Sequence, residues 1–74
     1  MPNEIDHTDR SLHPLVIRAA LACYRVRQAR REHAAASEAA AIEALDAALV
    51  ALAAHPEEIP GEAGVARLVR KLGL

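Results

Sequence analysis

A stretch of about forty residues, from position 15 to position 54, contains neither glycine nor proline. It is rich in alanine, leucine, arginine and glutamate, which are strong helix formers. Proline occurs only at its borders, at Pro14 and Pro56, where it can begin or end a helix without interrupting one. The sequence therefore predicts an all-α protein in which helix covers residues 14 to 54.

This stretch can form either one continuous helix or a helical hairpin. The absence of glycine favours a continuous helix, which would be about 60 Å long at 1.5 Å per residue, and this is the preferred prediction. The polar segment 27–33, together with Ser37 as an N-cap residue, favours a hairpin that turns near residues 34–36. Two continuous helices that cross antiparallel in a homodimer would pair the same residues, because the two arrangements are related by domain swapping.

The two ends of the chain have simpler patterns. Residues 1–11 form a polar segment, predicted to be a partly disordered tail, and residues 12–74 are predicted to form a single all-helical domain. Ser11 or His13 can cap the first helix. The loop at residues 55–61 contains two prolines and a glycine, and a short helix is predicted over residues 62–72. The result is a small helical bundle or an antiparallel homodimer.

The core of such a bundle is short of large side chains. The chain has 74 residues, no tryptophan or phenylalanine, and Tyr24 as its single aromatic residue. A domain of this size buries only about 60% of the surface of its unfolded chain, so its stability is marginal. We therefore expect a second surface to help stabilise it, supplied by self-association or by a partner.

Composition excludes several classes of protein. Cys23 is the only cysteine, so no disulfide forms within the chain, and we expect a buried thiol in a reducing compartment. The N-terminal segment does not resemble a secretion signal and no apolar run reaches about 20 residues, so we expect a cytoplasmic protein without a membrane span. Eight arginines to one lysine, with abundant alanine, are typical of a GC-rich genome, and we expect a bacterial or phage origin.

We expect no enzyme activity, no cofactor and no metal site. His7 and His13 lie near Asp6 and Asp9, but their spacing matches no zinc pattern and one segment supplies too few ligands. The chain has no glycine-rich phosphate loop, and no nucleophile and base share a rigid element. It is also too small for a conventional substrate pocket.

Apolar side chains instead favour protein–protein interaction. We predict a small helical adaptor, regulator or inhibitor that docks on a larger protein by placing an apolar helix face in a groove. The predicted contact residues lie on the first and last helices and are Leu15, Ile17, Leu21, Tyr24, Val65, Leu68, Val69 and Leu72.

An alternative function is a nucleic-acid-associated regulator. Arginines at helical spacing can neutralise phosphates, and the candidate residues are Arg25, Arg27, Arg30 and Arg31. The net charge of −1, the lack of stacking aromatic residues and the acids available to pair with these arginines favour the first function over this one.

Overall fold

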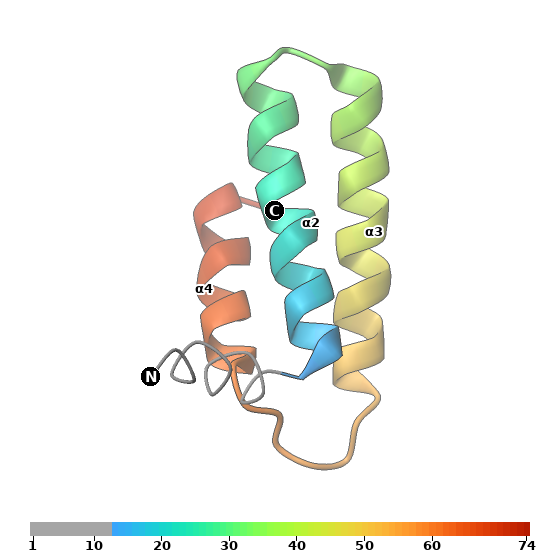
Figure 1. Ribbon diagram of the computed structural model, residues 1–74, viewed down its shortest axis with the longest axis vertical. Helices are drawn as coiled ribbons and strands as arrows, with labels where there is room; N and C mark the ends of the chain where they lie inside the picture. The colour runs from blue at the N-terminus through green and yellow to red at the C-terminus, as the bar shows by residue number, and fades with distance from the viewer. Residues whose placement is uncertain (1–12) are drawn as a thin grey trace, which may run out of the picture.

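The computed structural model describes residues 13–74, which form a small bundle of three helices (Figure 1). Helix α2 spans Pro14–Arg31, α3 spans Ala35–Ala53 and α4 spans Glu62–Leu72. Helices α2 and α3 form an antiparallel hairpin, and α2 lies between the other two and contacts both. The predicted all-α bundle is confirmed, whereas the predicted tail at residues 1–11 lies outside the described residues.

Helix α2 begins as the sequence predicts. His13 is the N-cap residue, and its Nδ1 accepts a hydrogen bond of 3.1 Å from the backbone N–H of Leu15. Pro14 occupies the first helical position, where an N–H would have no intrahelical partner in any case. Ser11, the other candidate cap, lies outside the described residues.

The long stretch turns, and the preferred continuous helix does not form. Helix α2 ends at Arg31 and α3 begins at Ala35, with His33 between them at a φ of 56°. This left-handed conformation is the one that glycine adopts most easily, and histidine is among the few other residues enriched in it. The cap differs from the predicted one, because Ala34 precedes α3 without a side-chain hydrogen bond and Ser37 lies inside the helix.

Small residues form much of the core. Leu45, Val26 and Cys23 are its largest fully buried side chains, and alanines fill much of the remaining contact between α2 and α3. Alanine lets two helix backbones approach closely, so this interface is tight although it contains little bulk. The core cluster consists of Val16, Ala19, Ala22, Cys23, Val26, Ala41, Leu45, Ala48, Leu52, Ile59, Val65 and Leu72.

Burial sets the chemistry of Cys23. Its side chain is 1% exposed, and desolvation raises the pKa of the thiol above its ordinary value. Because burial favours the neutral thiol, the burial of Cys23 contributes fully to stability at pH values below the thiol pKa of the unfolded chain. This contribution is lost as the pH rises through the higher thiol pKa of the folded protein.

No helix within residues 13–74 is both long enough and apolar enough to cross a membrane.

We expect Cys23 to be protected from alkylation. At pH 8, iodoacetamide should modify the folded protein about 100-fold or more slowly than the protein unfolded in guanidinium, because reaction requires opening of the core. Mass spectrometry of timed samples measures both rates. Equal rates in the two states would show that the thiol is accessible in the folded protein.

Candidate interaction surface

The outer face of α2 carries an exposed apolar stripe. Ile17, Leu21 and Tyr24 are 39%, 49% and 56% exposed, respectively. Their spacing of four and then three residues places them along one line of the helix. At 3.6 residues per turn this line lies about 180° from the buried side of α2, which includes Ala19 and Val26. We call Ile17, Leu21 and Tyr24 the α2 stripe.

The stripe is exposed because α2 has more apolar surface than its two neighbours can cover. Apolar residues surround the first two-thirds of the helix, but α3 and α4, which flank α2, leave its outer face uncovered. Leu15 is half-buried and packs against the core, so it contributes less to the free face. In a chain this short, three bulky side chains left in solvent on one helix are a substantial loss of possible core.

Arginines border the α2 stripe on both edges. Arg18 and Arg25 follow one edge, and Arg27 and Arg31 follow the other, as their helical spacing requires. All four are exposed, and none of them forms an ion pair within residues 13–74. Helix α2 contains five arginines and no acidic residue; the nearest acid, Glu32, is the residue that caps its C-terminal end. The exposed face of α2 is therefore apolar along its centre and basic at both margins.

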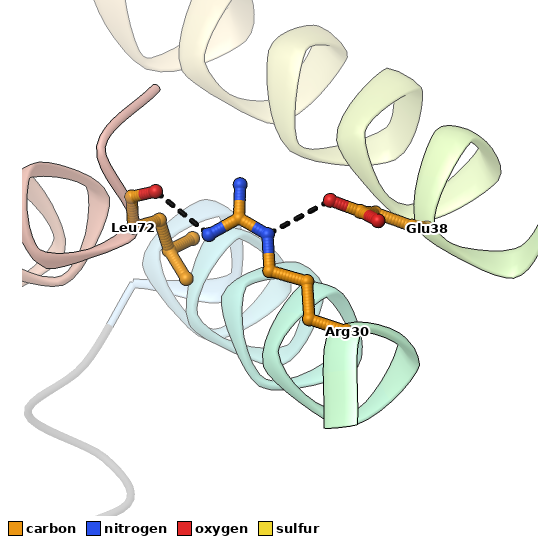
Figure 2. A network of polar contacts seen from close by, with 3 residues as sticks. All are labelled: Arg30, Glu38 and Leu72. Atoms are coloured by element: carbon orange, nitrogen blue, oxygen red, sulfur yellow. Dashed lines mark hydrogen bonds and ion pairs between the residues drawn. The ribbon is translucent and has the colours of Figure 1, made fainter. Parts of the chain in front are cut away.

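The fifth arginine, Arg30, joins the three helices (Figure 2). Its Nε lies 2.8 Å from Oε2 of Glu38 in the first turns of α3, and its Nη1 donates a 2.7 Å hydrogen bond to the backbone carbonyl of Leu72. Leu72 is the last residue of α4, where carbonyls lack intrahelical partners and the helix dipole favours a cation. Arg30 is therefore a structural residue that fixes the end of α4 against the hairpin.

We expect Arg30→Met to destabilise the protein by about 1 kcal/mol. The substitution removes two charge-assisted hydrogen bonds but keeps an apolar stem, and partial exposure of the ion pair limits the loss. Urea unfolding followed by circular dichroism measures the change. Arg31→Met is the matched control and should change the urea midpoint little. Equal shifts in the two variants would show that Arg30 does not have this structural role.

The four arginines of the predicted nucleic-acid site do not form one patch. Arg27, Arg30 and Arg31 line one shallow groove with Lys71 of α4, whereas Arg25 faces the opposite side of α2. Arg30 is engaged by Glu38 and Leu72. Lys71 could not be placed beside these arginines from the sequence, because its position depends on how α4 docks.

The predicted partner-binding residues divide into two groups. The α2 stripe is exposed, whereas Val65 and Leu72 of α4 are buried in the bundle and Leu68 and Val69 are half-buried against the core. The α4 residues are therefore largely occupied within the monomer. Val50 and Leu74 were not among the predicted contact residues, although their side chains are 66% and 53% exposed. A binding role for any of these residues stays a prediction.

Other hollows on the molecule offer little chemistry. One groove, of about 360 Å³, lies between α2 and α3 and is lined by four alanines together with Arg25, Gln28, Glu32 and Ser37. The rings of His13 and His55 meet edge to face with their centres 5.1 Å apart, but Nδ1 of His13 is already used in the helix cap. Within residues 13–74, no group of three or more His, Cys, Asp and Glu side chains is placed to hold a metal ion.

No protein-family model, no curated protein and no solved structure matches this chain. The shape and charge of its own surface are therefore what indicate its function. On both counts the outer face of α2 is the most distinctive region within residues 13–74.

Proposed function

We propose that this protein is a small non-enzymatic helical protein that docks on a larger protein, as an adaptor, regulator or inhibitor, through the outer face of α2. The observation that carries this proposal is the exposed α2 stripe between two rows of arginines that form no ion pair within residues 13–74. The protein would act in the cytoplasm, where its single free thiol stays reduced.

The composition of this face supports the proposal. Tyrosine and arginine are enriched among the residues that contribute most to binding energy at protein interfaces. Tyr24 offers a large rigid surface, and the neighbouring Arg25 can form bidentate bonds with carboxylates. Leu21, at the centre of the stripe, would then be the side chain most deeply covered by a partner.

Two other occupants have weaker support. A nucleic acid could contact Arg27, Arg31 and Lys71 around one groove, but the apolar stripe separates Arg25 from them and Arg30 is engaged by Leu72. A homodimer through α2 would place arginines of one copy against those of the other. Photo-crosslinking can detect either a nucleic-acid complex or a homodimer.

Site-specific photo-crosslinking tests the proposal. A photoreactive phenylalanine analogue replaces Leu21 in the full chain, which is expressed in its native cells, and Val50 on α3 is the matched exposed position. We expect a discrete adduct larger than a dimer from position 21 but not from position 50. This adduct should resist nuclease and should disappear when an excess of the unmodified chain competes.

Three results would contradict the proposal. They are an adduct only of dimer mass, an adduct removed by nuclease, and equal labelling from positions 21 and 50. The second would favour the nucleic-acid-associated regulator. For that function, replacing Arg27 and Arg31 with glutamate should abolish a salt-sensitive retention of DNA or RNA.

A further inference from the structure

We propose that the α2 stripe binds an acidic amphipathic helix of another protein, one whose apolar residues recur at helical spacing and are flanked by glutamate or aspartate. This inference rests on the proposed function and specifies the chemistry of its partner. It is carried by the length of the stripe, by the charges along its borders and by the way α2 already packs within the bundle.

The dimensions of the stripe suit a helix. Ile17 and Tyr24 are seven residues apart, which corresponds to about 10 Å along the axis, or two turns. A partner helix with apolar residues at positions i, i+4 and i+7 would present side chains at the same interval. The face of a helix is convex, and the ridges of a second helix fit between its side chains.

The borders of the stripe specify the charge of that helix. Arg18 and Arg25 on one edge, with Arg27 and Arg31 on the other, are exposed and form no ion pair within the part of the chain that is described. The net charge of the whole chain is −1, so this basic strip is a local concentration of charge rather than a general property of the protein. An acidic helix would neutralise both edges, and a basic one would be repelled.

The bundle already contains one example of this pairing. Helix α3 carries three acidic residues and no basic one, and it packs antiparallel against the inner side of α2. The Glu38 carboxylate of α3 binds the guanidinium of Arg30 at 2.8 Å. The outer side of α2 also presents apolar side chains next to arginines, but no helix covers it within residues 13–74.

The α2 face of a second copy does not complement this face. A two-fold axis through Leu21 would place arginine margins against arginine margins, because α2 has no acidic residue. The acidic surface of α3, with Glu43 and Asp46, could face the stripe of another copy. In a two-fold dimer of this kind, α2 of each copy would contact α3 of the other, so self-association is an outcome that the test must detect.

Labelled peptides test the charge of the partner. The first probe is a fluorescein-labelled helical peptide of about 18 residues with leucine at i, i+4 and i+7 and glutamate at the flanking positions. The second probe has lysine in place of every glutamate. Fluorescence anisotropy with the full-length protein should show that the acidic peptide binds at least about tenfold more tightly, with an affinity that falls as salt rises from 50 to about 300 mM.

A charge reversal tests the location. In the double variant Arg18→Glu and Arg25→Glu, one edge becomes acidic while the other keeps Arg27 and Arg31, so the preference for the acidic peptide should disappear. The matched control is Arg67→Glu with Arg70→Glu, an equal change of charge on exposed residues of α4, and it should keep the original preference. Circular dichroism verifies that both double variants are folded.

Several results would overturn the inference. The inference is wrong if the two peptides bind equally or if the lysine peptide binds the unmodified protein more tightly. It is also wrong if a labelled 20-nucleotide DNA binds more tightly than the acidic peptide, or if the Arg18/Arg25 variant keeps the original preference. Self-association of the protein, measured by light scattering at the same concentrations, would also overturn it. If the acidic peptide does not bind but photo-crosslinking at position 21 still yields a protein adduct, only the proposed chemistry of the partner is wrong. If the peptide does not bind and no protein adduct forms, the proposed docking face is wrong.

Discussion

Replacing Leu45 with alanine should lower the free energy of unfolding by about 3–5 kcal/mol. Leu45 is 1% exposed and is the largest fully buried side chain, so its truncation loses apolar burial and leaves a cavity in a thin core. At about 0.05–0.15 kcal/mol per residue, a protein of this size has only about 4–11 kcal/mol in total. Thermal unfolding followed by circular dichroism should show a loss of most of the stability, or a variant unfolded at room temperature.

Val50→Ala is the control for this experiment. It removes a branched apolar side chain from the same helix, but Val50 is 66% exposed, so its loss should change stability by at most about 0.5 kcal/mol. If the two variants unfolded at the same temperature, Leu45 would not be part of a packed core, and the described arrangement of α2 and α3 would be wrong.

The opposite change, an increase in volume, should have the second largest effect. Ala19 is 0% exposed and lies in the core cluster, where no space is available for three further carbon atoms. We expect Ala19→Leu to cost about 1–3 kcal/mol, since the helices must separate or the new side chain must adopt a strained rotamer. At about 4–8 °C per kcal/mol in a domain of this size, the melting temperature should fall measurably.

Ala47 provides the matched position for this substitution. It lies on the exposed side of α3, and leucine has nearly the same helix propensity as alanine, so Ala47→Leu should leave the melting temperature nearly unchanged. A stabilised Ala19→Leu variant would mean that the core is loosely packed at this position and that alanine is not what sets the distance between the helices.

Much of the helical architecture could be predicted from composition and from helix-breaking residues. The loop after α3 contains Pro56, Pro60 and Gly61, and the helix that follows shows a regular apolar face. The turn at His33 could not be predicted in the same way. Histidine tolerates a positive φ better than most residues, but this stretch has no glycine to mark the turn, and the packing of α2 against α3 depends on contacts distant in the sequence.

Prediction of the site was limited for a related reason. Helical periodicity identifies which face of a helix is apolar, but not whether another helix covers it. Periodicity therefore predicts both the exposed Leu21 and the buried Val65 as partner-contact residues. Arg30 could not be separated from its neighbours either, because its acceptor, the Leu72 carbonyl, lies 42 residues away in the sequence.

The central position of α2 has a consequence for how the protein opens. Helix α4 makes its main contacts with α2, and Arg30 holds its C-terminal end, so α4 can detach while the hairpin stays closed. Helix α2 packs against both neighbours, so it loses its last packed neighbour only when α3 separates as well. Its backbone amides should therefore exchange with deuterium last, near the rate set by global unfolding, and those of α4 should exchange earlier. The helix with the free outer face would then be the most persistent part of the molecule.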